Sequence, residues 1–312
     1  MNQKEMSVGS AVSAEISKSI GESSRIDCIQ LRGRQFFVKR DDLVDPLLSG
    51  NKYRKLFKLI QTPADQYQQL VSYGGTQSNA MLSLAALCHR KGWQFHYTSK
   101  PVAHHLKTNP TGNLALALEL GMQLHETAHD EYEHAVRSLQ SRADDSSTLF
   151  VPQGGADPIA QHGIHKLAQE ISHWQQTNGV ERLHIVTPSG TGTTAFYLAA
   201  SLSAATVLTT ATVGDNACLT AQMNRLGHIP DNLHMLENSN KHHFAKPCPD
   251  LLAMYRELTA TGIEFDLIYA AHMWHTLLQH IDDIDGTILY IHSGGLSGNK
   301  SMLDRYAHKN LL

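Results

Sequence analysis

Short apolar runs recur along the chain, and longer stretches with the spacing of amphipathic helices separate most of them. We predict strands over residues 35–39, 69–74, 94–99, 123–128, 148–153, 182–188, 205–213, 232–237 and 287–293, and helices over stretches such as 78–92 and 158–176. This alternation predicts βαβ units and therefore an α/β protein with mostly parallel sheets. Because so many strands rarely share one open sheet, two sheet domains are expected. The polar stretch 237–250 is predicted to be a loop.

The composition is that of a folded globular protein. Of its 312 residues, 41% are hydrophobic and 18% are charged, which provides enough apolar material for a sizeable core. The net charge is −3 and no basic tract is present, so a nucleic-acid partner is not expected. The N-terminal residues contain no apolar signal core, and no apolar run of about 18 residues follows, so a membrane partner is not expected either.

The cysteines and histidines form no motif typical of a metal site. Cys28, Cys88, Cys218 and Cys248 are widely spaced and include no CxxC pair, which favours a reduced, cytoplasmic protein. The 20 histidines include the adjacent pairs His104-His105 and His242-His243, but none belongs to an HExxH motif or to a Cys/His cluster with ligand spacing. We therefore predict that most histidines are solvated and that no metal is bound.

The segment VKRDDLVDPLLSGNKYRKL (residues 38–56) places one lysine in a position suited to covalent chemistry. A strand-like run ends in charged and turn residues, and Lys52 then falls in the first turn of a predicted helix. A nucleophilic lysine needs a pKa below its ordinary value of about 10.4. The helix N-terminus and the cations Arg40, Arg54 and Lys55 all disfavour the ammonium form. Lys52 is therefore a candidate for a Schiff base with a carbonyl compound such as pyridoxal phosphate (PLP), with an ordinary surface lysine as the alternative.

A second candidate segment is YGGTQSNAM (residues 73–81), in which two glycines precede Gln77, Ser78 and Asn79. The glycines permit a tight turn and close ligand approach, and the three polar residues fall at a predicted helix start. Backbone N–H groups and side-chain hydroxyls at such a start suit a carboxylate. The alternative is a plain helix N-cap, in which Ser78 or Asn79 serves only the backbone.

Two further glycine-rich junctions follow predicted strands, where ligands bind in parallel α/β sheets. TPSGTGTTAF (residues 187–196) combines flexible backbone, hydroxyls and a helix start, which together suit a phosphate group. Its candidate phosphate ligands are Gly190, Thr191, Gly192, Thr193 and Thr194. It has neither the lysine of a Walker motif nor GxGxxG spacing. In YIHSGGLSGN (residues 290–299), Ser293 is able to hydrogen-bond a ring nitrogen, and a surface turn is the alternative.

In this order, the four motifs resemble those of fold-type II PLP-dependent enzymes, specifically the 1-aminocyclopropane-1-carboxylate (ACC) deaminase and D-cysteine desulfhydrase family. RDDL with SGNKYRKL is similar to that family's RDDL…GGNKxRKL element, GGTQSN to its GGxQSN element, and VPQGGADPIAQHG (residues 151–163) to its glycine-rich stretch before a long helix. The resemblance spans roughly residues 35–299. With it we expect a tryptophan synthase β-like fold, in which residues 1–52 and 154–312 form the larger domain, residues 53–153 form the smaller one, and PLP lies between them.

Carried over position by position, the resemblance implies that Lys52 holds PLP and moves a proton at the substrate Cα. Lys55, one turn further along the same helix face, would bind the cofactor phosphate together with residues 190–194. Asn79 would contact the ring oxygen. Gln77, Ser78 and Asn79 would hold the substrate. Tyr269 would lie beside the ring, so that the predicted catalytic residues are Lys52, Ser78 and Tyr269.

Around Tyr269 the sequence departs from the family pattern, because it reads DLIYAAH where DPVYxGK is common. ACC deaminases resemble one another in having Glu after this tyrosine, facing the pyridine nitrogen, and here the position is Ala270. A carboxylate there would keep the ring protonated and a strong electron sink. We expect a PLP-dependent lyase or deaminase, a homodimer, that acts on a small amino acid by α,β-elimination. Another PLP-dependent lyase or racemase, or a non-catalytic relative that binds PLP or an amino acid, is the alternative.

Overall fold

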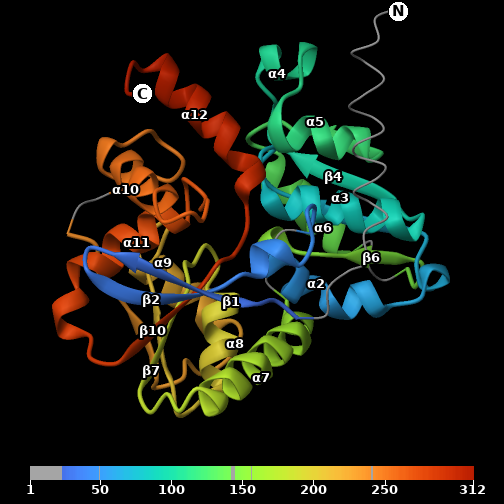
Figure 1. The fold of residues 1–312 in the computed structure, drawn as a ribbon. Helices are drawn as coiled ribbons and strands as arrows, with labels where there is room; N and C mark the ends of the chain where they lie inside the picture. Colours follow the sequence, from blue (N-terminus) through green and yellow to red (C-terminus); the bar gives the residue numbers. More distant parts are fainter. Residues whose placement is uncertain (1–22, 49, 142–144, 156, 240–241) are drawn as a thin grey trace, which may run out of the picture.

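A six-stranded and a four-stranded sheet organise the chain (Figure 1). The computed structural model describes residues 23–48, 50–141, 145–155, 157–239 and 242–312. The six-stranded sheet has the order β1-β2-β10-β7-β8-β9, and its strands are β1 (Ile26–Leu31), β2 (Arg34–Lys39), β7 (Leu183–Val186), β8 (Thr206–Thr209), β9 (Leu233–Met235) and β10 (Thr287–Ile291). The four-stranded sheet has the order β5-β4-β3-β6, with β3 (Gln69–Tyr73), β4 (Gln94–Ser99), β5 (Met122–Glu126) and β6 (Thr148–Phe150).

Helices connect and cover the strands. They are α2 (Asn51–Gln61), α3 (Asn79–Lys91), α4 (His104–Thr108), α5 (Gly112–Glu119), α6 (Tyr132–Ser141), α7 (Gln161–Thr177), α8 (Thr193–Ser201), α9 (Asn216–Asn224), α10 (Pro249–Thr259), α11 (Ala270–Gln279) and α12 (Asn299–His308). Among the described residues, no helix combines the length and the apolar character needed to cross a membrane.

All neighbouring strands are parallel except β1 and β2, which confirms the predicted α/β fold. The predicted strands are all present, although several end earlier than expected. Strand β8, for example, ends at Thr209 rather than at residue 213. Strand β1 was not predicted, because its sequence IDCIQL mixes polar and apolar residues along an edge of the sheet. It reaches β2 through a tight turn in which Arg32 and Gly33 both have positive φ, as hairpin turns require.

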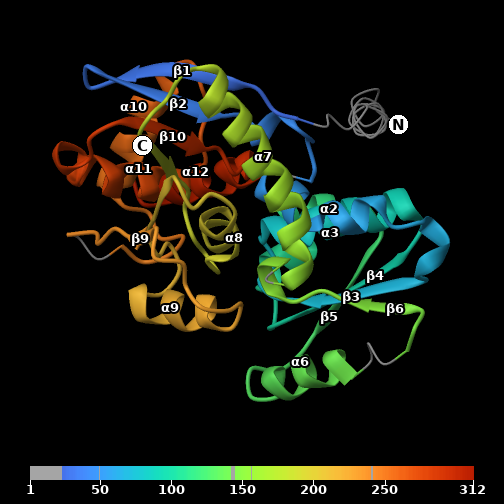
Figure 2. The ribbon, with the colours of Figure 1, turned by 90° about the horizontal axis from the view of Figure 1, so that it is seen from below.

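The six-stranded sheet is buried on both faces, because alternate side chains of each strand enter different cores. On β10, Leu289 and Ile291 pack with residues of α7 and α8, whereas Ile288 and Tyr290 pack with residues of α10 and α11. The four-stranded sheet packs one face against α2, α3 and α5. Figure 2 shows α6 on its opposite face. Both sheets thus have the helix-covered architecture of a doubly wound fold.

Helix α2 lies between the two sheets and packs along α7 (Figure 2). The approach is close, because a Cβ on Gly163 of α7 would overlap the carbonyl of Arg54. Arg54 is fully buried and pairs with Asp41 at 2.8 Å and with Glu170 of α7 at 2.7 Å. This buried network fixes the position of the helix that begins at Asn51. The division into domains 1–52 with 154–312 and 53–153 stays a prediction.

Candidate active site

Three of the four predicted motifs follow three neighbouring strands. Strand β10 pairs in parallel with β2 on one side and with β7 on the other. The segments that leave their carboxyl ends, which carry Lys52, Ser293 and Gly190, therefore emerge at one edge of the sheet. The fourth motif follows β3 of the other sheet and meets the turn after β10 at Gly295, where a Cβ would lie 2.6 Å from Asn79 Nδ2. The fold thus brings all four motifs together.

The start of α2 is pressed against the turn after β10. Gly50 has φ +47°, and a Cβ at this position would overlap the carbonyl of Ser293 and lie 2.6 Å from the Gly294 nitrogen. The Asn51 N–H donates to the Ser293 carbonyl at 3.2 Å. Lys52 Nζ in turn donates to Asn51 Oδ1 at 2.9 Å. Only glycine permits this backbone conformation together with this close contact. Gly50 therefore fixes the position of the helix turn that carries Lys52.

Burial lowers the pKa of Lys52 to about 8, while the negative charge of Asp266 opposes this shift. The direction agrees with the sequence-based expectation, but burial, which the sequence did not indicate, is the largest cause. Arg40 is paired with Asp27 and Asp42, and Arg54 with Asp41 and Glu170, so these guanidinium charges are compensated locally. Removal from water is the main reason why the amine of Lys52 loses its proton readily.

Lys55 lies one turn after Lys52 and points at the predicted phosphate loop. Its Nζ donates to the Gly154 carbonyl at 3.1 Å and to Thr191 Oγ1 at 3.4 Å. Burial, with a further contribution from the charge of Lys52, places the pKa of Lys55 well below its ordinary value. A buried ammonium of this kind is stabilised by an anion, and among these neighbours it has only neutral oxygens.

The loop after β7 has the donors that a phosphate group requires. Thr191 Oγ1 and Thr193 Oγ1 lie 3.0 Å apart, and the N–H groups of the first turn of α8 begin at Thr193. The hydroxyl of Thr194 is buried and has no hydrogen-bond partner among the described residues. Such an unsatisfied buried hydroxyl is costly unless a ligand completes it. The loop and Lys55 therefore fit an anionic group between them.

Tyr269 and Asp266 form the wall opposite this loop. A Cβ on Gly190 would lie 3.4 Å from Tyr269 Cε1, so the tyrosine ring borders the glycine. Asp266 is buried and accepts hydrogen bonds from the N–H groups of Ile268, Tyr269 and Ala270, at 3.1, 2.6 and 3.0 Å. Burial and the nearby carboxylate raise the pKa of Tyr269, which keeps its phenol protonated.

Asp266 was absent from the predicted site residues. Burial raises its pKa, while the three N–H donors and His292 oppose that shift. Its carboxylate orients the first turn of α11, which begins after Tyr269, and it is the charge that acts most strongly on Lys52. An Asp three residues before Tyr269 has the spacing of a helix N-cap and was the available signal.

The GGTQSN segment is held by α3 and α5. Ser78 Oγ accepts hydrogen bonds from the N–H groups of Ala80 and Met81, so it forms the N-cap of α3, as the simpler alternative proposed. Its predicted catalytic role stays a prediction. The buried Asn113 of α5, which the sequence did not single out, donates from its backbone N–H to Gln77 Oε1 and from its Nδ2 to Asn79 Oδ1. These bonds fix the orientation of the side-chain amides of Gln77 and Asn79.

Residues 17–294 match the family model described as pyridoxal-phosphate dependent enzyme. The chain belongs to this family. PLP is accordingly its cofactor. The contact of Lys55 with Thr191 and the unsatisfied hydroxyl of Thr194 fit the cofactor phosphate. The assignment of PLP-binding residues stays a prediction.

Several relatives share most of this chain. A putative 1-aminocyclopropane-1-carboxylate deaminase of Thermotoga maritima is 25% identical over 289 residues, which cover 85% of this chain and 90% of the relative. A bifunctional D-cysteine desulfhydrase/1-aminocyclopropane-1-carboxylate deaminase of Arabidopsis thaliana is 26% identical over 306 residues, which cover 88% of this chain and 76% of the relative. A crystal structure of an ACC deaminase homologue superposes with a TM-score of 0.74 at 19% identity over the whole of both chains. These relatives are fold-type II PLP-dependent proteins, as the motifs predicted.

The unsatisfied hydroxyl of Thr194 leads to a direct test of the phosphate loop. Replacing Thr194 with Val is expected to weaken PLP binding roughly 10- to 150-fold, because a hydrogen bond to a charged group contributes about 1.5–3 kcal/mol. The apoprotein should keep its stability, since the hydroxyl has no partner there. Thr187→Val is the matched control, because this hydroxyl is also buried and unpartnered but lies before the candidate phosphate ligands, which begin at Gly190. Equal PLP dissociation constants for the two variants would remove Thr194 from the site.

Proposed function

We propose that this protein is a PLP-dependent lyase or deaminase that acts on a small amino acid by α,β-elimination. The observation that carries the proposal is Lys52, whose amine has a pKa of about 8 and lies at the junction of all four motifs. The proposal includes a homodimer in the cytoplasm. It also includes the division into a larger domain, residues 1–52 and 154–312, and a smaller one, residues 53–153, with the substrate bound between them.

When bound, PLP supplies an electrophilic carbonyl and an electron-accepting ring. Burial lowers the pKa of Lys52 to about 8, so its amine would hold the cofactor and would take and return a proton at the substrate Cα on Nζ. Lys55 and the hydroxyls of Thr191 and Thr194 bind and orient the phosphate. The protonated phenol of Tyr269 would assist proton transfer, or its ring would stack on the cofactor ring.

The GGTQSN segment would bind the substrate. Asn113 holds the amides of Gln77 and Asn79 in fixed orientations, so they are preorganised for a carboxylate and for the ring oxygen. The N–H groups at the start of α3 lie beside them. Asn79 also borders Gly295, which connects the carboxylate subsite to the turn that carries Ser293. We include Ser293 as the partner of the ring nitrogen.

The identity of residue 270 sets the expected substrate preference. Ala270 is buried and packs in the apolar cluster with α10 and α11, so no carboxylate is supplied from this position. Elimination of a good β leaving group needs less carbanion stabilisation than opening a cyclopropane ring. We therefore expect D-cysteine or β-chloroalanine to be turned over faster than ACC, with keto acid and ammonia measured as products. Rapid ammonia release from ACC, with none from D-cysteine, would contradict this assignment.

A racemase or epimerase is the second candidate, because one relative is named for that reaction. The nocardicin C-9′ epimerase of Nocardia uniformis is 28% identical over 298 residues and covers 85% of this chain. Both reactions begin with removal of the Cα proton. The two reactions can be distinguished in deuterated water. Epimerisation incorporates deuterium at Cα and inverts the configuration of Cα without releasing ammonia. Elimination releases ammonia and keto acid from the same substrate.

A further inference from the structure

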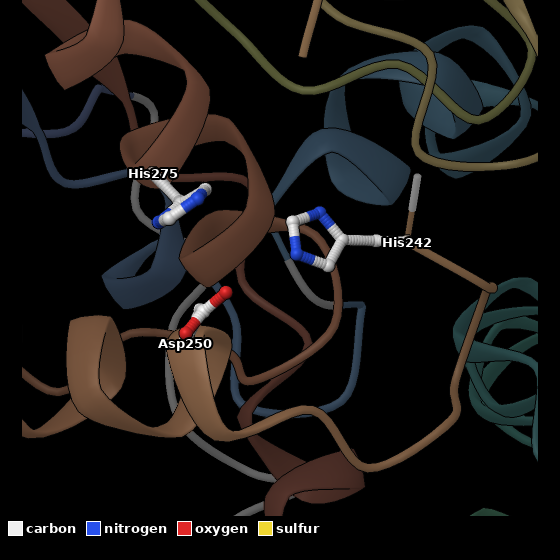
Figure 3. Close-up of side chains that lie close together, drawn as sticks. All are labelled: His242, Asp250 and His275. Carbon is white, nitrogen blue, oxygen red and sulfur yellow. The ribbon is translucent and has the colours of Figure 1, made fainter. Parts of the chain in front are cut away.

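Two histidines and an aspartate from three separate segments converge beside α11, away from the Lys52 site. His242 lies in the segment before α10, Asp250 in the first turn of α10, and His275 in the middle of α11. One potential ligand atom from each residue lies within 4.8 Å of the other two (Figure 3). Figure 3 shows the carboxylate and both rings directed toward a common space. Imidazole and carboxylate groups in such an arrangement are typical ligands of zinc.

A further histidine borders this group. His272 lies three residues before His275 on the same face of α11, and its ring centroid is 5.1 Å from that of His242. Only 6% of His272 is exposed, so its ring forms part of the buried wall beside the cluster. The convergent ligand atoms are those of His242, Asp250 and His275.

Side-chain amides fix the orientation of two of the rings, since Asn238 Nδ2 contacts His242 Nδ1 at 3.2 Å and Gln279 Nε2 contacts His275 Nε2 at 2.9 Å. These contacts leave the other nitrogen of each ring to face the metal.

We propose that His242, Asp250 and His275 bind a divalent transition metal of the zinc class. Two imidazoles and one carboxylate suit zinc, whereas calcium and magnesium prefer oxygen ligands. Bond lengths of about 2.0–2.1 Å place tetrahedral ligands roughly 3.3 Å apart, so small side-chain rotations would close the site around the ion. Three protein ligands leave the fourth tetrahedral position to a water molecule.

The proposed metal would connect the cluster to the active site. It would join the 242–248 segment to α10 and α11, and Phe244 in that segment packs on Tyr269 with ring centroids 5.6 Å apart. Tyr269 immediately precedes α11. The metal would therefore hold Phe244 over Tyr269. This site is separate from the proposed reaction, and its existence does not depend on which substrate the protein uses.

Zinc titration of the full-length, PLP-loaded protein tests the proposal. After removal of metals with a chelator, calorimetry should show one tightly bound Zn²⁺ per chain. Asp250→Asn and His275→Asn should each weaken this binding roughly 10- to 100-fold or more, because even outer-shell changes have effects of that size. His243→Asn is the matched control, since this exposed neighbour of His242 lies outside the cluster. Its affinity should equal that of the wild type.

Surface histidines provide a competing explanation, which a further variant separates. His96 and His125 are exposed, and their ring nitrogens lie 3.0 Å apart. Loss of the tight site in His96→Asn/His125→Asn, with full affinity in Asp250→Asn and His275→Asn, would overturn the proposal. The absence of tight zinc binding in the wild type would overturn it equally. PLP absorbance in every variant monitors folding, and the exposed position of Asp250 makes its substitution structurally mild.

Discussion

Replacing Lys52 with Ala is expected to remove covalent PLP and to lower turnover by several orders of magnitude. The reason is that Lys52 combines a pKa of about 8 with a position at the junction of the four motifs. Lys55 cannot substitute for it, because its Nζ is directed to Gly154 and Thr191 at the phosphate loop. The measurement is the visible absorbance of the covalently held cofactor, together with the rate of keto acid formation.

Two lysines on the same helix provide controls for this variant. Lys58→Ala should leave both absorbance and turnover unchanged, since Lys58 is exposed at the last turn of α2. Lys55→Ala should weaken PLP affinity while the cofactor that does bind stays covalently attached. Wild-type absorbance in Lys52→Ala, or loss of the covalent band in Lys55→Ala at saturating PLP, would contradict the assigned roles.

The second large effect is expected from Gly50→Ala. The added methyl group would overlap the carbonyl of Ser293, and the φ of +47° disfavours any residue with a Cβ. Either the first turn of α2 or the 293–295 turn must move, and both belong to the proposed site. We expect a loss of roughly 1–3 kcal/mol in the free energy of unfolding. We also expect a loss of most PLP binding, because Lys52 is displaced. Thermal unfolding and cofactor titration measure the two effects.

Gly298→Ala is the matched control for this change. Gly298 follows the 293–295 turn that Gly50 contacts, and a Cβ on Gly298 would meet no heavy atom within 4 Å. Its φ of −76° is accessible to alanine. Stability and PLP affinity should therefore stay at wild-type values. If Gly50→Ala behaved like Gly298→Ala, the close contact between α2 and the 293–295 turn would have no role in placing Lys52.

Local sequence predicted the strands and the site motifs because both depend on neighbouring residues. The hydrophobic period, the turn residues and the helix starts locate the junctions at Lys52, Asn79 and Gly190. Parallel strand pairing then places three of the four motifs at one edge of the sheet. The edge strand β1 was missed because its polar residues face solvent and hide the period. The source of the Lys52 pKa was also misjudged, since the pairing of Arg54 with Asp41 and Glu170 is a tertiary feature.

Contacts between distant segments were beyond the reach of the sequence. Asn113 fixes Gln77 and Asn79 across 36 and 34 residues of chain. The histidine cluster forms because the segment before α10 folds back onto α11. Only His272 and His275 have a spacing that sequence alone could have related, as i and i+3 on one helix. The predicted absence of a metal therefore rested on spacing within single segments, where this cluster leaves no pattern.

Borohydride reduction of the PLP-loaded protein, followed by peptide mapping, tests the central claim most directly. Reduction makes the link between cofactor and lysine permanent, and mass spectrometry of the peptides locates it. The structure predicts one modified residue, Lys52, within the NKYRKL segment, with Lys55 unmodified. A reduced adduct on Lys55, or on a lysine outside α2, would contradict the assignment of Lys52 as the residue that holds PLP.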